Sequence, residues 1–415
     1  ATTGSFTIPL MKSTGFASET AAGIEAAASS GGALMPPIMG AGAYMMLEIL
    51  STIDPEISYL KIIQAALIPA MLYYFALLLA VHFHAKRIGA TTEVSSIEAP
   101  DDKGAHGEEN TRYQGIVFFA SFIILIAMLL WGFTPFLAVS VSLVGICLIA
   151  AASKKTRIGA RKLAKAMVAA ARNGTSLIVA AACVGIILGV VDMSGLGPAL
   201  PAKVQVLAGD SAMLALLLLM VSTIILGMGL PSAVCYLLVA LTVSSVLAVL
   251  DTPPLAAHLF IFYFGMMSMV TPPVALAAYA GAAIAEGNII KSAFAAFRFA
   301  LVGFALPFSF VFKPELLMLT RGNEAASILM ILFVVGLTLV AIVALAAAVA
   351  GYAFGRIGVL LRVVLLSCSL SIFLLRLDGL QTWIQVVGAV TAIVVLAFSF
   401  YSPSNARPSL TSQPA

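Results

Sequence analysis

Charged residues are scarce in this sequence: they make up 10% of its 415 residues, whereas 61% are hydrophobic. A soluble globular domain carries about 25% charged residues, so the composition excludes an ordinary soluble protein and indicates a lipid bilayer. The net charge of +4 argues against a nucleic-acid partner. The four cysteines all lie in apolar runs, which favours buried side chains over a disulfide framework or a metal site.

Long apolar stretches follow one another along the chain, each of a length that crosses the hydrocarbon core. They lack the period-two alternation of a barrel, and continuous Leu, Ile, Val and Ala runs satisfy their backbone polar groups as helices. The sequence therefore predicts an all-α, multi-pass integral membrane protein. The stretches are 59–83, 113–131, 134–152, 166–192, 213–250, 288–312, 327–350, 357–376 and 379–401.

Two further apolar segments, 17–50 and 256–286, are interrupted in the middle by small residues and a Pro-Pro pair. Because proline removes a backbone donor and disfavours helix at the preceding residue, each segment is predicted to form a re-entrant helical hairpin. PPIMGA at 36–41 aligns with PPVALA at 272–277, which indicates an internal repeat. The interrupting residues are Ser29, Ser30, Gly31, Gly32, Pro36 and Pro37 in the first segment, and Ser268, Met269, Thr271, Pro272 and Pro273 in the second.

A shorter break precedes each predicted hairpin. Five predicted crossings separate the two hairpins, and an odd number places their mouths on opposite faces. Inverted repeats with broken helices at matching positions indicate a secondary transporter with a site at the midplane. The breaks consist of Gly4, Ser5, Thr7 and Pro9 in the first half and Gly227, Gly229, Pro231 and Ser232 in the second.

The predicted organisation has six parts along the chain. They are a first repeat (1–83, with the hairpin 17–50), a polar linker (84–112), connecting helices (113–165), a second repeat (166–312, with the hairpin 256–286), additional C-terminal membrane helices (313–401) and a tail (402–415). The densest basic cluster lies between Lys154 and Lys165 and favours the cytoplasmic face. Five crossings from a first hairpin that opens to the cytoplasm would instead place this cluster outside, so the sequence leaves the orientation open. Because Ala1 opens an apolar segment, we expect the chain to be part of a longer membrane protein.

The breaks predict binding of Na⁺ and of an anion. Unwound backbone in a membrane needs another partner for its oxygens, and a hard cation takes several oxygen ligands. The expected Na⁺ ligands are Ser29, Ser30 and Gly32 at one tip and Ser268 and Thr271 at the other, completed by the facing breaks. Half-helices beginning at the Pro-Pro pairs would direct their positive N-termini at the same cavity and favour an anionic substrate.

Two ionisable residues inside the apolar segments, Glu25 and Asp192, are candidates for function, because a charge in the bilayer is costly. If H⁺ rather than Na⁺ is the coupling ion, these residues are the expected carriers. No cofactor is predicted apart from the coupling ion.

These segments closely resemble the large permease subunit of TRAP transporters: TGSFTIPLMKSTGF, EAAASSGGALMPPIMGAGAYMM, GMGLPSAVCYLLVA and HLFIFYFGMMSMVTPPVALAAYAGAAIAEGN. VHFHAKRIG and the additional C-terminal helices are similar to the fused permeases that work with TAXI-type binding proteins. The resemblance covers residues 1 to about 320. It implies an elevator fold of the ion-transporter superfamily in the bacterial or archaeal inner membrane. It also implies Na⁺-driven uptake of an organic acid delivered by a periplasmic binding protein, and a small membrane subunit or fused N-terminal helices that are absent from this chain.

Three alternatives remain open from the residues. A stand-alone Na⁺- or H⁺-coupled carboxylate symporter would need no binding protein, and a channel would use the same carbonyl sites without a coupled gradient. An intramembrane enzyme is disfavoured because the sequence has no HExxH motif and no membrane Ser–His arrangement. His82, His84 and His106 lie near or in the linker, and His258 lies just inside the predicted second hairpin.

Overall fold

The computed structural model describes residues 3–90, 108–152, 157–195, 199, 203, 206–209, 211–230, 233–240 and 252–401. Every regular element in these ranges is a helix. Four of the described helices are long and apolar enough to cross a membrane: Tyr59–Ile88, Ile289–Phe312, Ile328–Ala350 and Gly379–Ser399. The predicted all-α membrane fold is confirmed.

Most of the predicted spans form helices close to the expected positions. Serine or asparagine side chains accept a backbone N–H at the starts of several of these helices, including Ser58, Asn288 and Ser327. Gly89 and Gly351, both with positive φ, follow two of the helix ends. The helices are α4 (Tyr59–Ile88), α5 (Glu108–Leu130), α6 (Pro135–Ala152), α7 (Ala160–Met193), α13 (Ile289–Phe299), α14 (Leu301–Phe312), α15 (Ile328–Ala350), α16 (Val359–Leu374) and α17 (Gly379–Tyr401).

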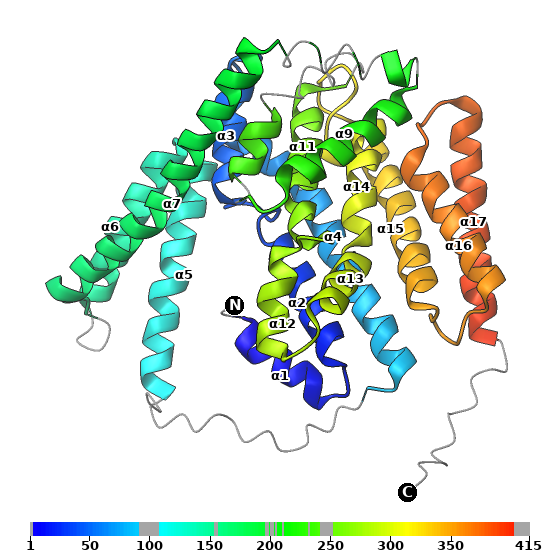
Figure 1. Ribbon diagram of the computed structural model, residues 1–415, viewed down its shortest axis with the longest axis horizontal. Coiled ribbons are helices and arrows are strands. Elements are labelled where there is room, and N and C mark those ends of the chain that lie inside the picture. Colours follow the sequence, from blue (N-terminus) through cyan, green and yellow to red (C-terminus); the bar gives the residue numbers. More distant parts are fainter. Residues whose placement is uncertain are drawn as a thin grey trace, which may run out of the picture.

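The predicted hairpin at 17–50 is wrong, because the segment passes straight through the molecule. It forms α2 (Ser18–Gly31) and α3 (Gly40–Ser51), which lie end to end (Figure 1). Its contacts follow α4 in antiparallel order, whereas a hairpin would return to the level at which it started. The contacts are the rings of Phe16 and His84, the Tyr73 hydroxyl on the Ala27 carbonyl at 2.7 Å, and the Tyr59 hydroxyl on the Pro37 carbonyl at 2.9 Å.

The predicted hairpin at 256–286 is wrong for the same reason. This segment forms α11 (Pro254–Met267), the 3-10 turn η1 (Ser268–Val270) and α12 (Leu276–Ala285). Helix α11 runs antiparallel to α14 and pairs Phe260 with Phe308, Phe264 with Phe304, and Met267 with Gly303, whereas α12 packs on α13 and α2. The whole of α11 from Leu255 to Met267 is buried, as expected for a helix that is apolar on all sides.

A hydrogen bond from an N–H to the carbonyl four residues earlier spans each Pro-Pro pair. Met39 N–H donates to the Met35 carbonyl, and Ala275 N–H donates to the Thr271 carbonyl at the matching position 236 residues later. Met39 and Ala275 both have positive φ, of 47° and 34°, and each directly precedes a helix start. The two broken helices are therefore antiparallel counterparts with the same local geometry.

The count of five crossings does not hold either. The span expected at 213–250 is interrupted, because α9 (Ala212–Gly227) ends at Gly227 and helix resumes at residues 233–240. In the first half, the break predicted at Gly4, Ser5, Thr7 and Pro9 is wrong, because these residues form the continuous helix α1 (Gly4–Ser13) with Pro9 inside it. Helix α1 occupies the comparable position before the first broken helix. The opposite sense of the broken helices follows instead from their direct packing, α2 on α12 and α3 on α11.

The broken helices stand in the centre of the molecule (Figure 1). Helices α5, α6 and α7 stand to one side of this centre. On the other side, α15 packs on α4, and α16 packs on α14 and α15. The 3-10 turn η2 (Pro314–Leu317) connects α14 to the segment before α15. Both breaks therefore lie in the central part of the molecule, where Met39 and Ala275 are buried and Ile38 and Pro273 are exposed.

Candidate functional site

The first candidate site lies between α1 and α2, around the carboxylate of Glu25. Thr3 and Thr7 are one helical turn apart, and both donate their hydroxyls to this carboxylate, Thr7 Oγ1 to Oε2 at 2.5 Å and Thr3 Oγ1 to Oε1. Ser29, one turn further along α2, donates to Oε1 at 3.3 Å. Glu25 is only 9% exposed. Three hydroxyls therefore gather on one buried acidic side chain just before the break.

The donor roles of these hydroxyls decide what else they can bind. A serine or threonine hydroxyl has one hydrogen and two lone pairs. With its hydrogen given to Glu25, each hydroxyl oxygen can only accept a hydrogen bond or coordinate a cation. The cluster is therefore suited to a cation and not to an anion.

The break itself adds a buried oxygen without a partner. Ser30 is 6% exposed, and its Oγ has no hydrogen-bond partner within the described part of the chain. Such a group costs free energy unless something satisfies it, so Ser30 fits the expected role of an ion ligand. Gly31 is required for packing, because a Cβ there would lie 2.4 Å from Cε1 of Tyr73.

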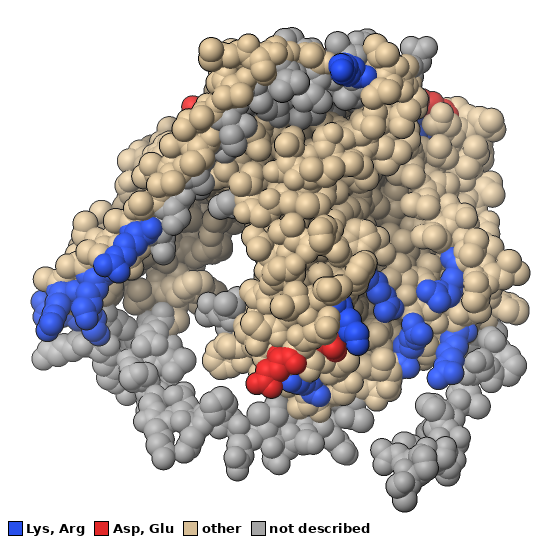
Figure 2. Space-filling model, viewed as in Figure 1, with Lys and Arg blue, Asp and Glu red and all other residues tan. Residues whose placement is uncertain are grey.

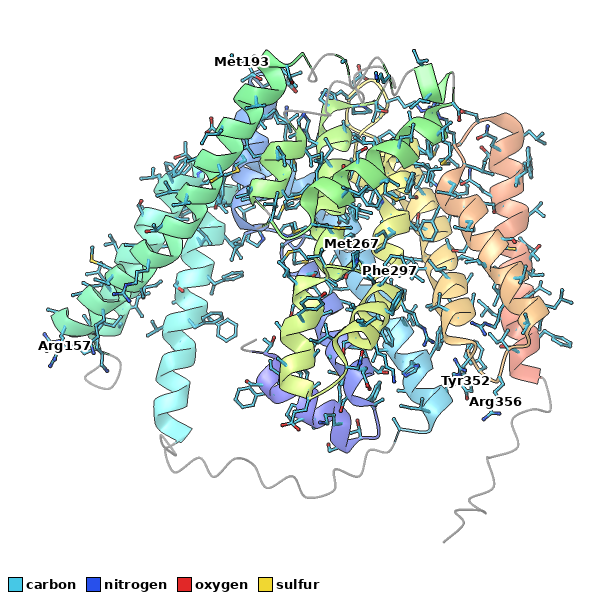
Figure 3. All side chains as sticks on the ribbon, in the orientation of Figure 1. Arg157, Met193, Met267, Phe297, Tyr352 and Arg356 are labelled. Carbon is cyan, nitrogen blue, oxygen red and sulfur yellow. The ribbon has the colours of Figure 1, made fainter. Side chains whose placement is uncertain are left out.

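The second candidate site lies where the end of α9 meets η1. Ser268 is 1% exposed, and its Oγ lies 2.7 Å from the Gly265 carbonyl and 3.1 Å from the Gly227 carbonyl. One hydroxyl hydrogen cannot serve both carbonyls fully. Thr271 Oγ1 donates to the Met267 carbonyl at 2.7 Å. Figure 3 labels Met267 near the centre of the bundle, at the end of α11.

Position 227, at the end of α9, requires glycine. A Cβ on Gly227 would lie 2.6 Å from Cys235 Sγ and 2.9 Å from Ser268 Oγ. No side chain fits in that space without displacing the break. The residue thus allows the end of α9 to lie directly against the second broken helix.

The structure brings together several of the predicted site residues. Thr7 and Ser29 meet at Glu25, Gly4 lies against the same side chain, and Gly227 meets Ser268. Ser5, Gly32 and Gly229 are exposed, whereas Pro36, Met269 and Pro272 are half-buried. Pro231 and Ser232 lie outside the described residues, as does the side chain of Asp192 near the end of α7.

The predicted helix starts at the Pro-Pro pairs are wrong. The helices begin at Gly40 and Leu276, after the positive-φ residues, so the prolines stay within the breaks. Tyrosine hydroxyls satisfy the carbonyls of the second proline in each pair: Tyr59 donates to Pro37 and Tyr279 donates to Pro273, the latter at 2.6 Å. These two carbonyls are therefore less available to an ion than expected.

Sequence reasoning missed Thr3 and the tyrosine donors. Thr3 and Thr7 have i, i+4 spacing, which places them on one face of a helix, so a helical projection of the first break would have found Thr3. Tyr59 and Tyr73 carry no local signal, because they reach the broken helix from α4.

Comparison with known proteins identifies a family match. The family described as "Tripartite ATP-independent periplasmic transporter, DctM component" matches residues 1–324. No curated protein matches the chain. The matched range contains both broken helices and both candidate sites, whereas α15, α16 and α17 lie beyond it.

Proposed function

Since the chain belongs to the DctM family, the large permease component of the TRAP transporters, we propose that it couples uptake of an organic acid to a Na⁺ gradient by an elevator movement. Membership makes the chain a multi-pass inner-membrane permease for secondary transport, as predicted. Large permeases of this family work with a periplasmic substrate-binding protein and a small membrane subunit. Use of a TAXI-type binding protein stays a prediction from the sequence.

The observation that carries the proposal is the set of hydroxyl and carbonyl oxygens at both candidate sites. Around Glu25 the site offers three hydroxyls, and near Ser268 it offers hydroxyls and main-chain carbonyls. These are the ligands that hard cations such as Na⁺ prefer. Each site joins a broken helix to the element before it, so ion binding there would hold these two elements together during movement.

The substrate group is proposed to be a carboxylate that meets the N-termini of α3 and α12. Neither broken helix contains Lys or Arg over residues 17–50 or 254–286. A helix N-terminus contributes about 0.3–1 kcal/mol to anion binding at an exposed site, whereas micromolar capture requires about 8 kcal/mol. The helix N-termini alone therefore contribute too little free energy for micromolar binding of the substrate, which supports capture by a separate binding protein.

We expect uptake to require both Na⁺ and the binding protein. The test is initial uptake by the full-length permease in proteoliposomes, with Na⁺ or choline outside and with or without the cognate binding protein. The proposal expects saturable uptake in the vesicles that have both. Equal rates in Na⁺ and choline would refute Na⁺ coupling, and micromolar uptake without the binding protein would favour a stand-alone symporter.

The basic residues indicate the orientation. Figure 2 shows Lys and Arg gathered toward the lower side of the view, over the α6–α7 connection and the lower ends of the helices on the right. The first group includes Arg157 and Arg161, and the second includes Arg87 at the end of α4. By the positive-inside rule this is the cytoplasmic side.

Cysteine labelling tests this orientation. In a variant lacking Cys147, Cys183, Cys235 and Cys368, we expect Arg157→Cys to react with an impermeant maleimide only from the cytoplasmic side. Glu324→Cys, near the start of α15, should react only from the periplasmic side. Both positions are exposed. The reverse pattern would show the opposite orientation.

A further inference from the structure

Three arginines from three different helices converge on the last turn of α15. Arg87 of α4 donates to the Ala350 carbonyl at 2.8 Å. Arg298 of α13 donates to the Val349 carbonyl at 3.0 Å, and Arg362 of α16 donates to the Ala348 carbonyl at 2.7 Å. We call these three residues the arginine triad. Figure 3 labels the nearby Arg356 at the same lower end of α15 and α16.

The triad carries more positive charge than its surroundings neutralise. A helix C-terminus is equivalent to about half a negative charge, against three guanidinium groups. Within the described residues the ion pair found is Arg321–Asp378, elsewhere in the chain, and no carboxylate pairs with the triad. Arg298 is also within electrostatic reach of both Arg87 and Arg362.

Most of the hydrogen-bonding capacity of the triad is unused. A guanidinium has five N–H donors, and each of the three makes one hydrogen bond among the described residues. Arg87 is exposed, and Arg298 and Arg362 are half-buried. The remaining donors suit an anion with several oxygens, such as a phosphate.

Exposed aliphatic side chains flank the triad. Val359, Leu360 and Val363 of α16, around Arg362, are 76%, 77% and 55% exposed, and Ile88 beside Arg87 is 40% exposed. In a chain that crosses a membrane, such side chains are suited to contact with lipid acyl chains. A lipid phosphate bound at the triad would therefore have its acyl chains next to apolar protein surface, an advantage that a free phosphate lacks.

We propose that the arginine triad binds the headgroup phosphate of an anionic phospholipid. Basic pockets between membrane helices on the cytoplasmic side are suited to such headgroups. Arg87 and Arg298 lie within the range matched by the family, whereas Arg362 and the α15 carbonyls lie beyond residue 324. The lipid would thus join the C-terminal helices to the transport core.

The test compares the full-length permease in two kinds of nanodisc. One kind contains phosphatidylcholine alone, and the other contains in addition roughly 20% phosphatidylglycerol as the anionic lipid. The wild-type protein should retain phosphatidylglycerol in native mass spectrometry and unfold at a higher temperature in the anionic discs. Arg87→Gln, Arg298→Gln and Arg362→Gln should each weaken retention by about fivefold. The matched control is Arg321→Gln, which removes an arginine whose partner is Asp378 and should leave retention unchanged.

Two further comparisons distinguish lipid binding from a purely structural role of the three arginines and from binding of a free anion. If the arginines only stabilise the end of α15, each Gln variant will lose the same stability in both kinds of disc, which would overturn the proposal. Arg362→Lys keeps the charge and should retain part of the phosphatidylglycerol effect. If glycerol phosphate or inorganic phosphate at millimolar concentration reproduces the full thermal shift in neutral discs, the lipid assignment is wrong.

Discussion

Replacing Gly227 with alanine is expected to lower the initial rate of Na⁺-driven uptake by about 10- to 100-fold. The added Cβ would lie 2.6 Å from Cys235 Sγ and 2.9 Å from Ser268 Oγ. Overpacking of this kind costs about 1–3 kcal/mol, and about 1.4 kcal/mol changes an equilibrium tenfold. The end of α9 would then move away from η1, and the Gly227 carbonyl would no longer lie beside the Ser268 hydroxyl.

Matched variants distinguish this effect from a general folding defect. Gly336→Ala on α15 adds the same methyl group where no atom lies within 4 Å, so its uptake should equal that of the wild type. Cys235→Ala removes the sulfur atom nearest to the new Cβ and should restore part of the activity of Gly227→Ala. The amount of folded protein is checked by size-exclusion chromatography. Full uptake by Gly227→Ala would show that this contact plays no part in transport.

The positions of the long helices could be predicted from the sequence because one property determines them. Continuous apolar stretches of bilayer length form helices with internally satisfied backbones, and α4, α15 and α17 begin within about one residue of the predicted spans. Capping residues such as Ser58 and Ser327 sharpen these starts. Neither feature depends on which other helices are nearby.

The path through the Pro-Pro pairs could not be predicted from the same signals. A helix break shows that the regular hydrogen bonds stop, but it does not show whether the chain then reverses or continues. The hydrogen bonds from Met39 to Met35 and from Ala275 to Thr271 span both breaks. Packing along α4 and α14 fixes the direction, and that information is distributed over distant residues such as Tyr59 and Phe308.

The candidate site could be predicted in part, for a related reason. Serine, threonine and glycine at the breaks indicated oxygen ligands, and Ser29, Ser268 and Gly227 do lie at contacts between elements. Glu25 was recognised because a carboxylate within an apolar segment is costly. The sequence did not show that Thr3, just before α1, and Thr7 of α1 bind this carboxylate, since these contacts depend on how α1 folds back against α2.

Replacing Glu25 with glutamine is expected to raise the Na⁺ concentration for half-maximal uptake by at least about tenfold. The carboxylate accepts hydroxyl hydrogens from Thr3, Thr7 and Ser29, which leaves the three hydroxyl oxygens free to face a cation. An amide presents a donor in place of one acceptor, so one hydroxyl must turn and accept, and it is lost as a ligand. A hydrogen bond to a charged group contributes about 1.5–3 kcal/mol, which corresponds to a change of tenfold or more.

The same variant separates Na⁺ coupling from H⁺ coupling, because an amide keeps the size of the carboxylate but cannot carry a proton. If Glu25 organises a Na⁺ site, saturating Na⁺ should restore most of the maximum rate in Glu25→Gln, and Glu48→Gln, at an exposed position on α3, should behave as the wild type. If Glu25 is a proton carrier, the variant should lose net uptake driven by a pH gradient at every Na⁺ concentration while still exchanging substrate across the membrane. Measuring net uptake and exchange side by side in proteoliposomes therefore assigns the role of Glu25, and retained exchange with no Na⁺ response would refute the Na⁺ site proposed around it.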